Sequence, residues 1–278
     1  MHSPRLHQGS AEQLWLIGGT GEGPPLAAAL LAAGWRLRVS LVGQEAARAY
    51  ASHPRLRLRI GPLGSADAVA ATISAARKRG QAFRWVVDAS HPFAAQVSAH
   101  LSEGCRQSGQ ALLRLQRPPP PDHAGLAVTR LQQLAELSQL PLRGSHLLLA
   151  IGARRLAEAV AHSPGALHHA RVLPRPGALR QALAAGLDQA RLACLQPGLP
   201  LDWQNRGGSP FTIERALCRR WRISAVLCRC SGGATETGWR QVAADLGLRL
   251  LLLERPEEQP ASETLNLAAL LVKLGCPP

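Results

Sequence analysis

Residues 86–95 read VVDASHPFAA, an apolar strand followed by polar groups and the start of a helix. Asp88, Ser90 and His91 therefore stand at the carboxyl end of a strand. In parallel α/β sheets this edge binds ligands, because helix N-termini with unpaired N–H groups meet there. We expect Ser90 to be the helix N-cap, with Pro92 in the first turn. The alternative is that Asp88 and Ser90 only cap the helix and His91 lies at the surface.

A glycine-rich turn lies near the N-terminus. Residues 14–17 (LWLI) predict a strand, residues 18–23 (GGTGEG) a turn, and the alanine-rich run after them a helix. Glycines let the backbone approach a phosphate closely, and the Thr20 hydroxyl adds a donor below the helix N-terminus. The spacing departs from GxGxxG, since Pro24 stands where the last glycine should fall. The turn indicates a nucleotide phosphate site or, alternatively, only a tight turn.

The next predicted strand, residues 36–42, indicates which dinucleotide would fit that turn. It ends without the Asp or Glu that hydrogen-bonds the ribose of NAD. Ser40 and the nearby Arg48 are better suited to a 2′-phosphate. The sequence therefore favours NADP over NAD.

A second turn of small residues lies late in the chain. Residues 225–230 (AVLCRC) predict a strand, and residues 231–233 (SGG) lead from it into a helical run at about residues 239–246. Such a turn can hold a second phosphate or a carboxylate, and it can also be an ordinary connection between a strand and a helix. The local sequence leaves both readings open.

A proline-rich stretch divides the chain into two predicted domains, residues 1–118 and 119–278. A proline run excludes regular helix and predicts an extended connector at residues 119–128. This connector is either a hinge or a rigid surface loop. Strands alternate with helical runs throughout, and a final helix is expected at about residues 261–274. The expected strands lie near residues 14–18, 36–42, 56–60, 84–88, 111–115, 146–151, 169–173, 191–195, 224–229 and 248–253.

The three turns in this order resemble the precorrin-6A reductase family of corrin (cobalamin) biosynthesis. The similarity spans roughly residues 14–256, and its most specific parts are a GGTxE-like turn at residues 18–22 and a DATHPFA-like segment at residues 88–94. The resemblance includes RLQRP at residues 114–118, after the fifth strand, and ERP at residues 254–256, after the last strand. Weaker matches are IG at residues 151–152, LP at 173–174, SPF at 209–211 and SGG at 231–233. The resemblance implies an α/β fold of two Rossmann-like halves with mainly parallel sheets, and an active site in the cleft between them.

The resemblance also implies a reaction, the NADPH-dependent reduction of a ring double bond of precorrin-6A or cobalt-precorrin-6A to the 6B product. The cofactor carries the hydride, and the protein contributes orientation and charge. We expect His91 to donate the proton, because a histidine with its ordinary pKa of about 6.5 can do so near neutral pH. Asp88 would orient His91 or position a water. Alternatively, solvent supplies the proton and His91 is a binding residue.

Other expected site residues follow from the turns and from the resemblance. Substrate carboxylates are expected at Arg154 and Arg229, with Phe93 also in contact with the substrate. Arg229 and Trp239 stand where the family commonly has lysines; arginine keeps the charge and tryptophan does not. The residues expected to contact the cofactor are Gly18, Gly19, Thr20, Gly21, Glu22, Ser40, Ser90, Ser231, Gly232 and Gly233.

The composition is that of a basic globular protein. The chain has 278 residues, of which 46% are hydrophobic, and its formal net charge is +14. Only Lys78 and Lys273 among its 32 basic residues are lysines. Arginine binds carboxylates in bidentate fashion, which suits a polycarboxylate tetrapyrrole and NADPH. Nucleic acid is not expected as a partner, because the arginines are spread along the chain without zinc-ligand spacing, an RNP-like motif or a basic tail.

Cysteine usage and hydropathy predict a cytoplasmic protein without a membrane segment. No apolar run approaches the ~20 residues that span a bilayer, and residues 1–13 lack the apolar centre of a signal peptide. The six cysteines show no CxxC pair and no metal-ligand spacing, so we expect reduced thiols and no metal. Transient contact with neighbouring enzymes of the corrin pathway is a further expectation.

Two other functions remain open at this point. One is another NADP-linked reductase or a nucleotide-sugar enzyme, although such enzymes normally carry a Tyr-x-x-x-Lys dyad, and Tyr50, the one tyrosine of the chain, has no lysine four residues on. The other is a dinucleotide-binding regulator without catalytic activity, which would bind NADPH and turn over no tetrapyrrole.

Overall fold

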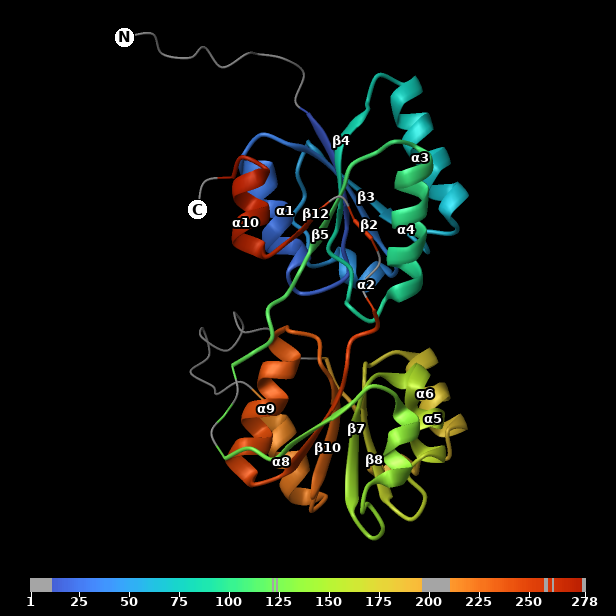
Figure 1. Ribbon diagram of the computed structural model, residues 1–278, viewed down its shortest axis with the longest axis vertical. Helices are drawn as coiled ribbons and strands as arrows, with labels where there is room; N and C mark the ends of the chain where they lie inside the picture. The colour runs from blue at the N-terminus through green and yellow to red at the C-terminus, as the bar shows by residue number, and fades with distance from the viewer. Residues whose placement is uncertain are drawn as a thin grey trace, which may run out of the picture. The chain divides into compact units, whose positions relative to one another are not determined.

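A computed structural model describes residues 12–121, 123, 125–196, 211–257, 260–261 and 263–276 (Figure 1). Residues 1–11, on which much of the signal-peptide argument rests, lie outside the described part, as do positions 122 and 124 of the expected connector. The chain forms two compact units. The first contains the residues up to Arg117 and those from Pro256 on, and the second contains Pro118–Arg255.

The described residues of the first unit form a six-stranded sheet in the order β12-β5-β4-β1-β2-β3, and every pair of neighbours is parallel. Strand β1 is central, and helices cover both faces of the sheet. The elements are β1 (Gln13–Ile17), α1 (Gly23–Ala32), β2 (Arg36–Leu41), α2 (Gln44–Ala47), β3 (Leu56–Ile60), α3 (Ala66–Lys78), β4 (Phe83–Asp88), α4 (Ala95–Gln107), β5 (Leu112–Leu115), β12 (Glu263–Leu265) and α10 (Leu267–Lys273).

The second unit repeats this arrangement. Its described residues form a parallel six-stranded sheet in the order β6-β11-β10-β7-β8-β9, with β7 in the central position. The helices, and the short 3-10 helices η1 to η3, alternate with the strands. The elements are β6 (Val128–Leu131), η1 (Leu134–Gln139), β7 (His146–Ala150), η2 (Ala153–Arg155), α5 (Leu156–Ala161), β8 (Leu167–Val172), α6 (Pro176–Ala184), η3 (Gln189–Arg191), β9 (Leu192–Cys194), α8 (Thr212–Arg220), β10 (Ala225–Arg229), α9 (Ala234–Leu246) and β11 (Arg249–Leu253).

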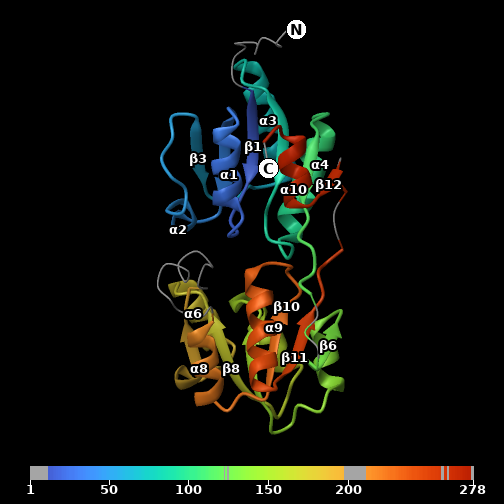
Figure 2. The same ribbon diagram turned by 90° about the vertical axis from the view of Figure 1, so that its left-hand side faces the viewer.

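The central strands are apolar on both faces because helices cover both sides of a parallel sheet. In β1, Leu14 and Leu16 pack toward α1 and α10, which lie side by side in Figure 2. Trp15 and Ile17 point to the opposite face and pack with α3 and α4. The period of two along the strand thus divides the core of this unit into two layers.

The structure corrects the expected domain division at the C-terminus. Residues from Pro256 on do not belong to the second unit, although the sequence placed them there; they return to the first. Strand β12 pairs with β5, and the Trp35 Nε1–H donates to the carbonyl of Leu274 at 2.8 Å. Leu270 and Leu274 are buried in the core layer of α1. The prediction was wrong here because a three-residue strand has too few positions to show a hydrophobic period.

A pair of histidines, of which His169 is buried and His146 is half-buried, links β7 and β8. His146 Nδ1 and His169 Nε2 are 3.2 Å apart, and Trp221 packs against His169. His169 is 3% exposed, and its Nδ1 has no hydrogen-bond partner among the described residues. Protonation of His169 would place an N–H without an acceptor in the core. Burial, reinforced by the charges of His146 and Arg191, lowers the pKa of His169 to about 4 from its ordinary 6.5.

This lowered pKa predicts a loss of stability in acid. The unfolded chain binds a proton at His169 below about pH 6.5, whereas the folded chain does so only near pH 4. As the pH falls from about 6.5 to about 4, the free energy of unfolding should therefore fall by on the order of 2 kcal/mol. The measurement is urea unfolding at several pH values, with His169→Gln as the comparison. If the variant keeps the same slope across this range, His169 is not the cause.

Candidate functional site

The topology of the first unit identifies one edge of its sheet as a binding edge. After β1 the chain builds β2 and β3 on one side, and after β3 it returns to place β4 on the other side of β1. Ligands of parallel α/β sheets bind at this point of reversal, outside the carboxyl ends of the strands. The glycine turn after β1 and the turn at residues 89–94 after β4 are therefore neighbours.

The glycine turn is closed on one side and open on the other. The N–H of Gly18 donates to the carbonyl of Ser40 at 3.0 Å. A Cβ on Gly18 or Gly23 would lie 2.5 or 2.3 Å from the Tyr50 hydroxyl, so these positions need glycine. Gly19 has a φ of +119°, and a Cβ there would have no neighbour within 4 Å. The turn therefore leaves space beside Gly19 for a ligand to approach the backbone.

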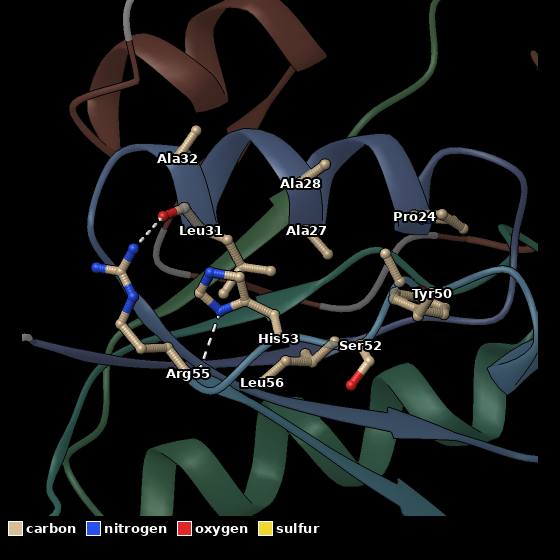
Figure 3. A pocket seen from close by; sticks show the side chains of 11 residues that line it. Pro24, Ala27, Ala28, Leu31, Ala32, Tyr50, Ser52, His53, Arg55 and Leu56 are labelled. Atoms are coloured by element: carbon tan, nitrogen blue, oxygen red, sulfur yellow. Dashed lines mark hydrogen bonds between the residues drawn. The ribbon is translucent and has the colours of Figure 1, made fainter.

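Tyr50 also lines an apolar cavity of about 360 Å³ on the flank of α1 (Figure 3). Arg55 and His53 lie at the cavity, where the Arg55 N–H donates to His53 Nδ1 at 3.1 Å. The Tyr50 hydroxyl is buried without a hydrogen-bond partner among the described residues, and burial raises its pKa to about 12. Because the walls are mainly apolar, this cavity does not offer the charges that a polyanionic ligand needs.

Gly23→Ala should destabilise the protein by about 2 kcal/mol, because the new methyl group would overlap the Tyr50 hydroxyl. Tyr50→Phe should be neutral or stabilising by about 1 kcal/mol, since it removes a buried hydroxyl without a partner. In the double variant the methyl group would face the ring carbon Cζ at 3.4 Å, an ordinary contact. Urea unfolding of the four proteins tests this coupling. Strictly additive changes would show that Tyr50 does not crowd Gly23.

Asp88 holds the turn after β4. It is buried; its Oδ1 accepts from the N–H of Ser90 at 2.9 Å, and its Oδ2 accepts from Ser98 Oγ at 2.7 Å and from Arg114 Nη1 at 3.0 Å. These contacts do not include His91, so they do not support the expected role of Asp88 in orienting that ring or a water. They make Asp88 a positioning residue that fixes the start of the turn.

His91 and Ser90 follow within the same turn. The N–H of Phe93 donates to His91 Nδ1 at 3.1 Å, so a neutral His91 ring carries its proton on Nε2. The rings of His91 and Phe93 are 5.7 Å apart between centroids. The expectation that Ser90 caps the helix was wrong: α4 begins at residue 95, and the buried Ser90 Oγ has no hydrogen-bond partner among the described residues.

Two of the expected cofactor contacts are already engaged within the protein. Thr20 Oγ1 donates to the carbonyl of Ala89 at 3.2 Å. Ser40 Oγ accepts from the indole N–H of Trp15 at 2.9 Å and is buried in the sheet. The Ser40 side chain therefore does not provide the expected site for a 2′-phosphate. Its backbone carbonyl instead supports the glycine turn at Gly18.

Arg117 joins the glycine turn to the turn after β4, and the sequence did not identify it as a site residue. Its guanidinium donates to Glu22 Oε1 at 2.9 Å, to Thr20 Oγ1 at 3.0 Å, and to the carbonyls of Ser90 and Ala89 at 3.2 and 3.4 Å. Burial alone would raise the pKa of Glu22, but the hydrogen bonds and charge of Arg117 outweigh it and lower this pKa below its ordinary value. Glu22 is thus a fixed anion bound to Arg117.

The second unit gathers arginines at its own point of reversal, between β7 and β10. A Cβ on Gly152, whose φ is +83°, would lie 3.0 Å from Arg229 Nη2. Burial, followed by the charges of Arg155 and Arg154, lowers the pKa of Arg229 to about 10. Arg155 is paired with Glu158, and Arg154 is exposed. Crowded positive charges at this edge favour an anionic ligand, and the binding of substrate carboxylates by Arg154 and Arg229 stays a prediction.

The turn at residues 231–233 is held from inside. The N–H of Gly232 donates to Glu236 Oε2 at 2.7 Å, and Glu236 Oε1 accepts from Arg240 Nε at 2.9 Å. Glu236 and Arg240 are fully buried in α9. The Gly232 N–H, an expected ligand donor, is therefore already used by the protein. Ser231 and Gly233 remain as the expected contacts of this turn.

The described residues contain neither a metal-binding cluster nor a helix able to span a membrane. Within the described ranges, no group of three or more histidine, cysteine or acidic side chains is arranged to hold a metal ion. The six cysteines are free thiols. None of the described helices is both long and apolar enough to cross a membrane.

Two parallel sheets with small-residue turns at their points of reversal define a protein of the nucleotide-binding α/β class. A family model described as Precorrin-6x reductase CbiJ/CobK matches residues 13–273. The chain therefore belongs to the precorrin-6x reductase family, and it is an oxidoreductase, as the resemblance in its turns implied.

Individual relatives agree with this assignment. The chain is 33% identical to cobalt-precorrin-6A reductase of Synechocystis sp. over 93% of its own length and 94% of the relative. It is 30% identical to precorrin-6A reductase of Rhodococcus erythropolis over 91% and 93%. A solved structure of CobK precorrin-6A reductase matches 97% of this chain and 99% of its own, with a TM-score of 0.72 and 28% identity.

Proposed function

We propose that this protein uses NADPH to reduce a ring double bond of precorrin-6A or cobalt-precorrin-6A, giving the corresponding 6B product of cobalamin biosynthesis. The observation that carries this proposal is the family match over residues 13–273, which includes both turns of the candidate site in the first unit. The relatives include enzymes named for the cobalt-containing substrate and for the metal-free one. The test therefore uses the cobalt-containing and the metal-free substrate separately.

The residues of the first unit fit NADPH. The backbone beside Gly19 is open, the glycine turn precedes α1 at the point of reversal, and Ser90 Oγ is a buried hydroxyl without a partner among the described residues. The chain after β2, Val42 and Gly43, offers no carboxylate for the ribose of NAD. Arg48, exposed at the end of α2, replaces Ser40 as the proposed contact of a 2′-phosphate. When bound, NADPH supplies the hydride.

The remaining roles belong to side chains of both units. His91 presents a proton on Nε2, and Phe93 restricts its ring by the backbone hydrogen bond to Nδ1. Arg154 and Arg229 would bind the acetate and propionate groups of the tetrapyrrole, because guanidinium groups pair with carboxylates in a fixed geometry. Asp88 acts by fixing the turn that carries His91.

His91→Asn should lower kcat by about 100-fold, the usual contribution of a positioned proton donor, and leave the Kd for NADPH unchanged. Asparagine keeps a polar side chain of similar size but cannot transfer a proton at this position. The measurement is steady-state turnover together with NADPH binding in the absence of substrate. A near-normal kcat with a raised KM would instead assign His91 to substrate binding, with solvent as the proton source.

The function itself is tested by following NADPH oxidation with precorrin-6A and cobalt-precorrin-6A supplied separately. Consumption with either substrate establishes the reductase and identifies its pathway. Tight NADPH binding without consumption of either would overturn the proposal and favour a dinucleotide-binding regulator. The same assay with NADH checks the preference inferred from the end of β2.

We further propose a cytoplasmic location and transient contact with neighbouring enzymes of the pathway. Six free thiols are compatible with a reducing compartment. Precorrins are supplied and consumed by other enzymes of the same route, and transient contact would limit the release of a reactive intermediate. Co-purification of the tagged protein with the preceding or following enzyme would test the contact.

A further inference from the structure

The equivalence of the two units extends to single positions at their points of reversal. Matching the central strands β1 and β7 makes β4 equivalent to β10, β5 to β11 and β12 to β6. The N–H of Gln116 donates to the carbonyl of Leu265, the last residue of β12, at 2.8 Å. The N–H of Glu254 donates to the carbonyl of Leu131, the last residue of β6, also at 2.8 Å. Gln116 and Glu254 therefore occupy equivalent positions.

The next residues along the chain are arginines with similar contacts. Arg117 donates to the carbonyls of Ala89 and Ser90 at 3.4 and 3.2 Å. Arg255 Nε donates to the carbonyl of Cys230 at 2.9 Å. In both units the accepting carbonyls directly follow the equivalent strands, β4 in the first and β10 in the second. Each arginine is also the last residue of a chain segment before it passes into the other unit, and each is followed by proline.

The chemistry of these contacts favours a positioning role. A guanidinium group is permanently charged and planar, so its hydrogen bonds fix the orientation of the carbonyls they reach. Fixing a carbonyl also fixes the peptide plane and the direction of the N–H on the next residue. Arg117 is 6% exposed. It therefore holds the shape of the two turns from within the protein.

We propose that Arg117 and Arg255 are paired positioning residues of the two units. Arg117 sets the affinity for NADPH through the turns at residues 18–23 and 89–94. Arg255 sets the affinity for the tetrapyrrole carboxylates through the turn that begins at Cys230, beside Arg229. The assignment of the two ligands to the two units rests on the proposed function, whereas the equivalence of the arginines rests on the strand order of the two sheets and on the hydrogen bonds.

The test is a comparison of Arg117→Met and Arg255→Met, because methionine keeps an unbranched side chain without charge or donors. Arg117→Met should raise the Kd for NADPH, measured by fluorescence titration of the full chain without substrate, by about tenfold. Its KM for the tetrapyrrole should stay within about twofold of wild type. Arg255→Met should raise the KM for the tetrapyrrole by about tenfold and leave the Kd for NADPH within about twofold of wild type. In both variants kcat at saturation should fall less than affinity, as expected for residues that act through a turn.

Controls separate positioning from general destabilisation. Arg106→Met removes an arginine from an exposed pair with Glu103, and it should change neither the Kd for NADPH nor the KM for the tetrapyrrole. Circular dichroism and urea unfolding establish that each variant is folded. An unchanged NADPH Kd in folded Arg117→Met, or an unchanged tetrapyrrole KM in Arg255→Met, overturns the corresponding half of the proposal. If Arg117→Met does not fold, Arg117→Lys decides, since lysine cannot reproduce the contacts and a wild-type Kd would contradict the role.

A different experimental result would contradict the proposed function. A wild-type chain that binds NADPH but consumes none with either tetrapyrrole contradicts the reductase activity, while the Kd of Arg117→Met still tests its positioning role. Loss of NADPH affinity in Arg117→Met together with normal wild-type turnover supports both proposals.

Discussion

Asp88→Ala is expected to destabilise the protein by about 3–5 kcal/mol, because it removes one partner of a buried ion pair. Arg114 would keep its charge in the core without this carboxylate, and Ser98 and the N–H of Ser90 would lose their acceptor. The turn that carries His91 would lose its anchor at the same time. Urea unfolding measures the loss of stability, and NADPH oxidation measures the loss of turnover in the fraction that remains folded.

Two substitutions control this prediction. Asp88→Asn keeps an oxygen for the Ser90 N–H but removes the charge, so it should cost less than alanine and retain part of the activity. Asp245→Ala breaks an Asp–Arg pair with Arg215 that is far more exposed, and it should cost less than about 1 kcal/mol. Equal losses at Asp88 and Asp245 would mean that the buried pair contributes nothing beyond an exposed one.

The sequence predicted the parts of the fold that depend on local patterns. Apolar runs such as residues 225–228 are buried in a parallel sheet, and they stand out against alanine-rich helices. Turns of glycine and serine mark the strand ends at which parallel α/β sheets generally bind ligands. For these reasons the alternation of strands and helices, and the two turns of the first unit, were predictable.

Long-range pairing was not predictable in the same way. Strand β12 has only three residues, and its partner β5 lies about 150 positions earlier in the chain. Strand β6 (VTRL) is also short and partly polar, and the sequence did not identify it. Both are edge strands, whose side chains are less buried and carry a weaker hydrophobic period. The return of the C-terminal segment to the first unit depends on these pairings.

The roles of polar side chains were the least predictable. Thr20, Ser40 and Asp88 have the residue types of ligand contacts, yet each of them is hydrogen-bonded to another residue of the protein. Arg117 forms its contacts with Glu22 across 95 positions of sequence, so no local spacing indicates them. The RP dipeptide after an apolar strand was the available signal, and it gains meaning only from the equivalent pair at Arg255.

Glu236→Ala is expected to destabilise the second unit by about 3–5 kcal/mol, for the same reason as Asp88→Ala in the first. Glu236 and Arg240 are 1% and 0% exposed, so the arginine would keep a buried charge without this carboxylate. The Gly232 N–H would also lose its acceptor. Urea unfolding measures the change, and Glu103→Ala, which breaks an exposed helical pair with Arg106, should leave the unfolding midpoint unchanged.

The double variant Glu236→Leu with Arg240→Met separates the stability of this pair from its effect on the turn. Replacing both buried charges by apolar side chains of similar size commonly restores stability. The Gly232 N–H would still lack its acceptor, so the turn at residues 231–233 would lose its fixed shape. We therefore expect stability near that of wild type together with a raised KM for the tetrapyrrole. A double variant with both normal stability and normal KM would show that Glu236 does not shape the turn for binding.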